Sequence, residues 1–263
     1  MGTVKLNRID PSSHSGVRDK SQALKLTAQL DKELYELLYL MFAFDHQSLL
    51  IILQGIDCSG KDGAVRHIFS ASNPQGMRVF SFKRPSLEEL RHDFLWRCHR
   101  HTPESGLAVI FNRSYYEEVT TTMVHPKLLK QQHIPPINLN EKEFFRSRYE
   151  QINDFEKMLS AKGTLVIKFF LHVSKQEQKR RLTERLKDRS KNWKFSPEDL
   201  KERKHWDAYM HSFEQMINAT STTAAKWTVV PSDNKWYRDY LVSKTLVSGL
   251  RKLKMQFPKA MKT

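Results

Sequence analysis

The sequence has no long apolar run and few cysteines. No stretch of the 263 residues is long and apolar enough to span a bilayer, and the polar segment through Ser21 predicts no secretory signal. The two cysteines, Cys58 and Cys98, do not suggest a disulfide scaffold, so we expect a reduced, cytoplasmic setting. Because the chain contains no C-x-x-C pair, a structural zinc site around Cys98, His99 and His101 is disfavoured.

Internal repeats and low-complexity blocks are also missing, and acidic residues are outnumbered. With 39% hydrophobic residues the chain can bury one sizeable core, so we expect a single domain over residues 1–263. The 44 basic residues against 29 acidic ones give a net charge of +15. Such a charge indicates a polyanionic partner: a nucleic acid, a membrane surface or a phosphate polymer.

The most informative motif is the run GIDCSGKD at residues 55–62, which fits the phosphate-binding pattern G-x-x-x-x-G-K. The pattern normally continues with Ser or Thr, whose hydroxyl binds Mg²⁺, but this chain has Asp62. A short apolar run precedes the motif and a helical pattern follows it, so backbone N–H groups would point at an anion. We therefore expect a phosphate site here; the alternative is a turn that only packs a helix against a sheet.

Strand and helix patterns alternate along the chain. Apolar, strand-like segments occur at Leu49–Leu53, Arg78–Phe82, Leu107–Phe111, Leu165–Val173 and Trp227–Pro231. Helical patterns occur at Gln22–Phe44, Gly63–Phe69, Leu87–His101, Glu141–Ala161, Lys175–Leu186, Pro197–Thr220 and Trp236–Met255. Strands separated by helices indicate a parallel sheet covered on both faces. The predicted fold class is α/β, with three layers and a five-stranded sheet; residues 131–140 are predicted to form a surface loop.

A second group of polar residues follows the third predicted strand, where open α/β sheets bind ligands. The residue that ends this strand is Asn112, whereas an ordinary metal-binding strand would end in Asp. Metal binding would then depend mainly on Asp57 and Asp62, with Glu117 or Glu118 as helpers, because Mg²⁺ prefers oxygen ligands near phosphates. Alternatively, Asp62 only stabilises a helix N-terminus, and the two glutamates form a solvated first turn.

Two basic clusters could bind phosphates. Lys83 and Arg84 follow a predicted strand directly, with Arg91 and His92 beyond them, and either grip a phosphate or nucleotide or form a solvated basic face. The segment 175–204 is dense in Lys and Arg, with Trp193, Phe195 and Trp206 between them. It resembles a helical lid whose arginines stabilise a transferred phosphoryl group; the alternative is a soluble, charged helix pair.

Several motifs together resemble the polyphosphate kinase 2 family. They are GIDCSGKDG at 55–63, NPQG at 73–76, FNRSYYE at 111–117, NWKFS at 192–196 and VPSDNKW at 230–236. The resemblance runs from about residue 31 to residue 250, in order and at the expected spacing. It implies a P-loop kinase-like core with a helical lid at about 175–212 and an N-terminal helical extension at about 1–46.

The resemblance also implies roles for individual residues. Catalytic roles fall to Asp57, Lys61, Asp62, Arg113, Arg181 and Arg185. Phosphate or polyphosphate binding is assigned to Gly55, Ser59, Gly60, Lys61, Gly63, Arg66, Lys187 and Lys194. Together with the basic cluster after the second predicted strand, the resemblance assigns nucleotide binding to Lys83, Arg84, Asn112, Arg113 and Glu117. The metal ligands are expected to be Asp57 and Asp62, for Mg²⁺ or alternatively Mn²⁺.

The expected activity is reversible phosphoryl transfer between inorganic polyphosphate and AMP, ADP or ATP, with guanine nucleotides as further candidates. The run FNRSYYE resembles the branch that uses both mono- and diphosphates, which associates Glu117 with the use of AMP. The resemblance further implies a homo-oligomer and no membrane partner. Two alternatives stay open: an ATP-dependent small-molecule kinase on the same core, which expects a hydroxyl after Lys61 and an acid at position 112, and a basic nucleic-acid-binding module, which we regard as less favoured.

Overall fold

The computed structural model describes residues 2–134, 140–190, 192–194 and 197–259. Five parallel strands form one sheet: β1 (Ser48–Gln54), β2 (Met77–Ser81), β3 (Ala108–Asn112), β4 (Thr164–His172) and β5 (Trp227–Pro231). Their order across the sheet is β2-β3-β1-β4-β5, with β1 in the centre and every one of its residues buried. The predicted five-stranded parallel sheet is confirmed, and no strand end differs from its predicted position by more than one residue.

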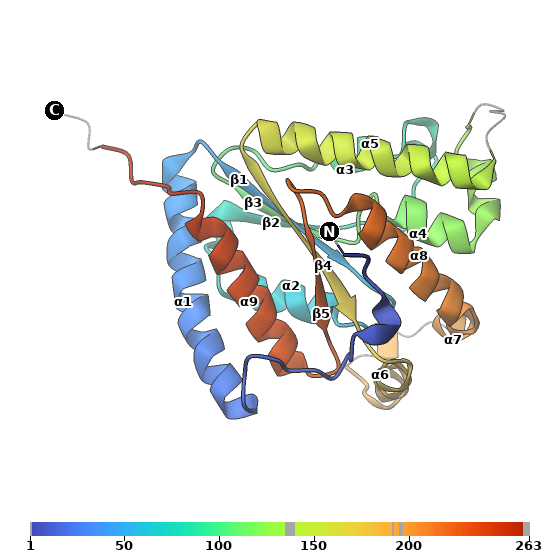
Figure 1. Cartoon of the computed structure of the whole chain (residues 1–263), viewed down its shortest axis with the longest axis horizontal. Helices are drawn as coiled ribbons and strands as arrows, with labels where there is room; N and C mark the ends of the chain where they lie inside the picture. The colour runs from blue at the N-terminus through green and yellow to red at the C-terminus, as the bar shows by residue number, and fades with distance from the viewer. Residues whose placement is uncertain (1, 135–139, 191, 195–196, 260–263) are drawn as a thin grey trace.

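Helices cover both faces of the sheet (Figure 1). One face packs against α1 (Lys20–Phe44), α2 (Lys61–Ser70) and α9 (Lys235–Arg251). The other packs against α4 (Glu117–Val124), α5 (Glu141–Ala161) and α8 (Trp206–Thr220). The described residues also form three shorter or peripheral helices: α3 (Trp96–His99), α6 (Lys175–Lys187) and α7 (Pro197–Glu202). Two apolar cores, one on each side of the sheet, therefore give the expected three-layer α/β architecture.

The predicted helix at Leu87–His101 is wrong. The segment forms only a 3₁₀ turn at Glu89–Arg91 and the short helix α3. Between them His92 is extended, and the Asp93 carboxylate accepts hydrogen bonds from the backbone N–H groups of Leu95 (2.9 Å) and Trp96 (3.1 Å). An Asp side chain that bonds nearby backbone in this way favours a new helix start over a continuing helix.

Other boundaries also differ from the sequence-based prediction. The predicted helix Pro197–Thr220 is divided into α7 and α8 by a 3₁₀ turn at Arg203–His205, and the last helix ends at Arg251 instead of Met255. Of the predicted loop at 131–140, residues 135–139 lie outside the described residues. Within the described part of the chain, no helix is both long enough and apolar enough to cross a membrane.

Candidate active site

The phosphate-binding motif forms the turn between β1 and α2, at the carboxyl edge of the sheet. Gly55 and Gly60 have φ of 147° and 110°, a region that L side chains rarely adopt. At Gly55 a Cβ atom would also lie 2.7 Å from the Ser59 hydroxyl and 2.8 Å from the Leu171 carbonyl oxygen. The Ser59 side chain is fully buried inside the turn. Tight packing thus fixes the loop at the N-terminus of a ten-residue helix, where backbone N–H groups are available to an anion.

Lys61 lies folded back over the loop. Its Nζ donates to the carbonyl oxygens of Gly55 (2.5 Å) and Ile56 (3.2 Å), and the residue is 8% exposed. Burial lowers the pKa of Lys61 from its usual value, and the neighbouring Arg113 charge lowers it further. Nearby carboxylates, among them Asp57, oppose this shift. The ammonium group is therefore held next to the loop with limited hydration, ready to exchange carbonyl partners for phosphate oxygens.

Arg113 and Asp57 form an ion pair between the end of β3 and the loop. An Nη2–H group of Arg113 donates to Asp57 Oδ1, and each side chain keeps about a third of its surface exposed (37% and 36%). Burial opposes ionisation of Asp57, but the charges of Arg113 and Lys61 outweigh it, so the pKa of the carboxyl group is lowered. Arg185 on α6 contributes to the same shift, which places its charge near Asp57.

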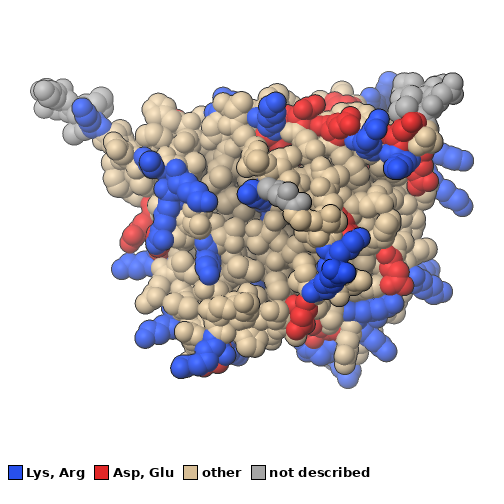
Figure 2. Space-filling model, viewed as in Figure 1, with Lys and Arg blue, Asp and Glu red and all other residues tan. Residues whose placement is uncertain are grey.

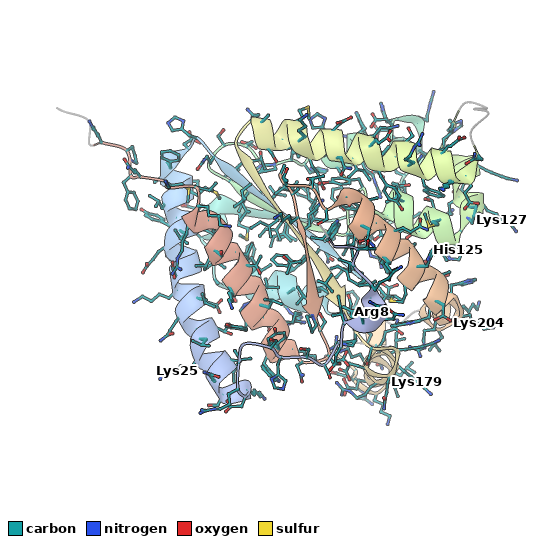
Figure 3. All side chains as sticks on the ribbon, viewed as in Figure 1. Arg8, Lys25, His125, Lys127, Lys179 and Lys204 are labelled. Carbon is teal, nitrogen blue, oxygen red and sulfur yellow. The ribbon has the colours of Figure 1, made fainter. Side chains whose placement is uncertain are left out.

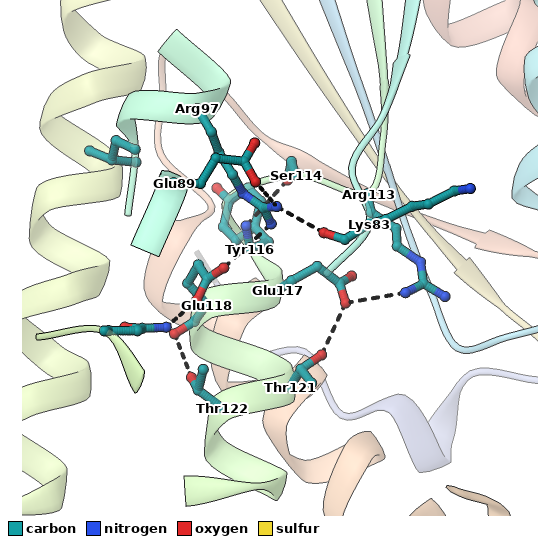
Figure 4. Close-up of polar contacts among 12 residues, drawn as sticks. Lys83, Glu89, Arg97, Arg113, Ser114, Tyr116, Glu117, Glu118, Thr121 and Thr122 are labelled. Atoms are coloured by element: carbon teal, nitrogen blue, oxygen red, sulfur yellow. Dashed lines mark hydrogen bonds and ion pairs between the residues drawn. The ribbon is translucent and has the colours of Figure 1, made fainter. Parts of the chain in front are cut away.

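Glu117 lies on the other side of Arg113, at the start of α4 (Figure 4). Its Oε2 is 3.9 Å from Arg113 Nη1 and accepts a hydrogen bond from Thr121 Oγ1 at 3.0 Å. The two carboxylates, Asp57 and Glu117, raise the pKa of Arg113 further above its already high value. Arg113 therefore stays charged at any physiological pH, between an acidic loop residue and an acidic helix residue.

Asp62 and Asn112, the two departures from an ordinary P-loop, contact each other. The Nδ2 atom of Asn112 donates to Asp62 Oδ1 at 3.0 Å and lies 3.5 Å from the Ser81 hydroxyl at the end of β2. The exposed Asp62 carboxylate is thus oriented toward the carboxyl ends of the central strands. An amide at position 112 suits this arrangement, because an Asp there would repel Asp62.

Glu118 does not belong to the site. It is 5% exposed, so the idea that it lies in a solvated first turn is wrong, and its pKa is raised by burial. It accepts from Gln132 Nε2 at 2.6 Å and pairs with Arg97 Nη2 at 3.4 Å, on the side of α4 away from Arg113 (Figure 4). Its role as a metal-binding helper is therefore excluded by its packing.

Arg181, predicted to act on the transferred phosphoryl group, is instead bonded to the back of the loop. Its guanidinium donates to the carbonyl oxygens of Cys58 and Ser59, both at 3.0 Å, and to those of Ser232 and Asp233 at 2.5 and 3.0 Å. Its Nε donates to Glu177 at 2.8 Å. All five N–H donors of the guanidinium are used by the protein itself, so in this arrangement Arg181 has none left for a phosphoryl group.

Sequence reasoning missed two residues that hold the loop. Gln178 on α6 donates from Nε2 to the Asp57 carbonyl at 3.0 Å, and Arg238 on α9 donates from Nη1 to the Gly60 carbonyl at 3.1 Å. Gln178 and Arg181 lie three residues apart and so share one face of α6. That spacing was a usable signal for Gln178, whereas no sequence pattern connects Arg238 to the loop.

The remaining predicted phosphate-binding residues lie at the surface around the loop. Lys83, Arg84, Arg66 and Lys187 are exposed; Gly63 is half-buried in the first turn of α2. The Lys83 carbonyl accepts from Arg97 Nη1 at 2.8 Å, and the Arg84 guanidinium contacts Gln131 at 3.2 Å. The side chain of Lys194 lies outside the described residues. The structure thus brings Asp57, Lys61, Asp62, Arg113 and Glu117 together.

Lys and Arg side chains gather at the lower right of the molecule, over α6 and α7 (Figure 2). Lys179 and Lys204 are exposed in this part of the molecule (Figure 3). Of the predicted aromatic anchors, Trp206 is buried in the core, Trp193 is 77% exposed and Phe195 lies outside the described residues. The basic segment is therefore partly packed onto the core and partly a solvated surface.

The residues present fit a divalent metal only together with a phosphate substrate. In the described part of the chain, no group of three or more His, Cys, Asp or Glu side chains is arranged to hold an ion. Asp57 and Asp62 nevertheless lie five residues apart, one in the turn after β1 and the other in the first turn of α2. Mg²⁺ is commonly held by one or two carboxylates plus substrate phosphates and water, and this donor set matches that pattern.

Comparisons with known proteins identify the family of this chain. A family model for polyphosphate kinase 2 matches residues 17–258. The ADP-polyphosphate phosphotransferase of Rhodopseudomonas palustris is 44% identical over 251 residues, which cover 95% of this chain and 86% of the relative. The AMP/ADP-polyphosphate phosphotransferase of Meiothermus ruber is 42% identical over 258 residues, which cover 98% of this chain and 92% of the relative.

The fold matches as well. The crystal structure of polyphosphate kinase 2 from Arthrobacter aurescens TC1 superposes with a TM-score of 0.92 at 39% identity, covering all of this chain and 91% of the other. The P-loop kinase-like fold expected from the sequence is thereby confirmed. A match of the family model over most of the chain and similarity to these relatives over their main length lead to one assignment: this chain belongs to the polyphosphate kinase 2 family.

Proposed function

We propose that this protein transfers a phosphoryl group between inorganic polyphosphate and nucleoside mono- and diphosphates, converting AMP to ADP and ADP to ATP, and the reverse. The observation that carries the proposal is the cluster of Asp57, Lys61, Asp62 and Arg113 on one phosphate loop, with Asn112 bonded to Asp62 where an ordinary ATPase has an acid. The relatives named ADP-polyphosphate, AMP/ADP-polyphosphate and GDP-polyphosphate phosphotransferase support the same activity.

The proposed reaction is an in-line displacement in which each side chain of the site has a separate role. A terminal phosphate oxygen of the nucleotide attacks the last phosphorus of the polymer; the bridging P–O bond breaks, and the chain leaves one phosphate shorter. No base is needed because a nucleotide phosphate is already ionised at neutral pH. Lys61 and Arg113 neutralise the equatorial oxygens, and Asp57 orients the attacking nucleotide. Mg²⁺, or Mn²⁺ in its place, would be held by Asp57 and Asp62 and would neutralise charge on the bridging phosphates.

Further parts of the proposal concern organisation and substrate choice. Residues 1–263 would form one kinase unit, with the N-terminal extension at about 1–46 and the lid at about 175–212. Lys83 and Arg84 would hold the nucleotide, Glu117 would permit the use of AMP, and Arg66, Lys187 and Lys194 would follow the polymer. We further propose a cytoplasmic homo-oligomer that also accepts guanine nucleotides.

Product analysis tests the proposed activity directly. Purified protein is incubated with polyphosphate, Mg²⁺ and AMP, ADP or GDP in turn, and nucleotides are separated by chromatography. We expect ADP and ATP from AMP and ATP from ADP, while Lys61→Ala, which lacks the loop ammonium, forms less than about 1% as much. Equal product in the wild type and in Lys61→Ala would contradict the proposal, as would turnover that requires ATP as phosphoryl donor.

A further inference from the structure

Arg238 is a buried arginine whose charged end lies against the phosphate loop from behind. It belongs to the first turn of α9, and only 4% of its surface is exposed. Nη1 donates to the Gly60 carbonyl at 3.1 Å, while Nε and Nη2 donate to Asp239 Oδ1 at 2.8 and 2.7 Å. A fixed guanidinium thus connects the last helix of the chain to the residue that precedes Lys61.

Two glycines of the motif make room for this guanidinium. A Cβ atom at Gly60 would lie 2.6 Å from Arg238 Nη1, and one at Gly63 would lie 2.8 Å from Nη1 and 3.1 Å from Nη2. Gly60 also needs glycine for its φ of 110°, but Gly63 has ordinary helical backbone. A side chain at position 63 would therefore require the Arg238 guanidinium to move.

A second guanidinium meets the first behind the loop. The position of a Cβ at Gly60 lies 3.6 Å from Arg181 Nη1, so both arginines reach the same point of the backbone. Burial lowers the pKa of Arg238, and so do the charges of Arg181 and Arg66, while Asp239 opposes the shift. Positive charges collected at one place are unfavourable alone and favour an anion on the exposed side of the loop.

We propose that Arg238 is a positioning residue for polyphosphate: it fixes the Gly60 carbonyl, so that the loop N–H groups face outward, and adds positive charge behind the bound phosphates without touching them. The inference rests on the proposed function, because it takes polyphosphate as the anion of this loop. Under the proposed function the loop next to Arg238 holds the polymer, whereas Lys83 and Arg84 hold the nucleotide, so substitution of Arg238 should weaken binding of the polymer more than binding of the nucleotide.

Substitution of Arg238 tests this role. For Arg238→Met we expect the Kd of inorganic tripolyphosphate, measured by calorimetry, to rise about tenfold, because the variant loses both the positive charge behind the loop and the hydrogen bond that fixes the Gly60 carbonyl. The KM for polyphosphate should rise equally and the KM for ADP should change less than about twofold. Arg238→Lys, which keeps the charge, should recover part of the affinity. The matched control is Arg251→Met on the same helix, where the arginine pairs with Glu33 at the surface.

A substitution in the loop tests the same contact between Arg238 and the loop. Gly63→Ala should displace the guanidinium and raise the Kd of tripolyphosphate to a similar degree as Arg238→Met. The double variant should be no weaker than either single one, because both remove one interaction. Additive losses in the double variant would overturn the proposal.

Thermal unfolding separates positioning from a purely structural role. If Arg238→Met lowers the Tm but binds tripolyphosphate as tightly as the wild type, the proposal is overturned. The binding measurement needs no turnover, so it tests the role of Arg238 separately from the proposed kinase activity. A wild type that binds tripolyphosphate but forms no nucleotide product contradicts the proposed function and leaves the role of Arg238 testable.

Discussion

At the scale of single residues, Lys168 is a charged group fully buried in the middle of β4. Its Nζ donates to Glu156 Oε2 at 2.6 Å, to the Tyr116 hydroxyl at 2.8 Å and to the Thr220 carbonyl at 2.7 Å. Glu156 is equally buried, and its Oε1 accepts from the hydroxyls of Tyr115 and Tyr116. The network therefore anchors the two tyrosines that follow Arg113 and so fixes the start of α4.

Removing one partner of this pair should be strongly destabilising. In Lys168→Met the Glu156 carboxylate stays buried without its ammonium, and we expect a loss of about 3–5 kcal/mol in the free energy of unfolding. Urea denaturation followed by circular dichroism measures it. The control Lys162→Met, at an exposed lysine, should lose less than about 0.5 kcal/mol.

A second substitution distinguishes an unpaired charge from poorer packing. Adding Glu156→Gln to Lys168→Met removes the buried charge and leaves an amide oxygen that accepts from Tyr115 and Tyr116. The double variant should therefore regain part of the stability. A double variant less stable than Lys168→Met alone would show that the cost arises from packing and not from charge.

At the scale of elements, the segment before α1 is bound to the core although its sequence is polar. The Leu6 N–H donates to Glu214 on α8 at 2.9 Å, and the Ser12 carbonyl accepts from Asn234 Nδ2 at 2.9 Å. The Ile9 carbonyl lies 3.2 Å from His172 Nε2 at the end of β4. The segment thus crosses β4, α8 and the start of α9, close to the turns that hold the phosphate loop.

His172 should make this attachment sensitive to acid. Burial lowers the pKa of His172, although the Ile9 carbonyl, Asp233 and Asp10 oppose the shift. Below about pH 6.5 the unfolded chain binds a proton that the folded chain does not, so stability falls as the pH decreases. We expect the fall in Tm between about pH 7 and about pH 5 to be a few degrees smaller in His172→Gln, whose amide can still donate to Ile9.

The exposed His46 supplies the control for this measurement. His46→Gln should leave the dependence of Tm on pH as in the wild type. If His172→Gln and the wild type lose the same number of degrees over this range, His172 is not the group responsible, and the acid sensitivity must arise elsewhere in the chain.

The elements differ in how far the sequence predicts them. The five strands were predictable because each is a short, continuous apolar run, a local property. The broken helix around Asp93 was not, since its side chain competes for the backbone within an otherwise helical pattern. For the site, the loop motif predicted Asp57, Lys61 and Asp62 as neighbours. The placement of Arg181 and Arg238 behind the loop depends on how α6 and α9 pack, which no local pattern encodes.

At the scale of the whole molecule, the net charge of +15 is unevenly distributed. The acidic residues of the site, Asp57, Asp62 and Glu117, are close to cations, whereas exposed lysines surround α6 and α7 (Figures 2 and 3). A flexible polyanion would contact several of these lysines at once and release counterions from its chain. Its binding should therefore depend on salt much more steeply than nucleotide binding.

Steady-state kinetics at increasing salt measure this difference. Between about 50 mM and about 200 mM NaCl, we expect the KM for polyphosphate to rise roughly ten- to hundredfold and the KM for ADP to rise less than about threefold. The variant Lys179→Gln with Lys204→Gln should lower the slope of log KM against log salt by about two, because each substitution removes one cation that would neutralise a phosphate of the polymer. Lys25→Gln on α1, on the opposite side of the molecule (Figure 3), should keep the wild-type slope. Equal slopes in all three proteins would mean that the polymer does not pass over α6 and α7, and that the basic surface there does not contribute to binding.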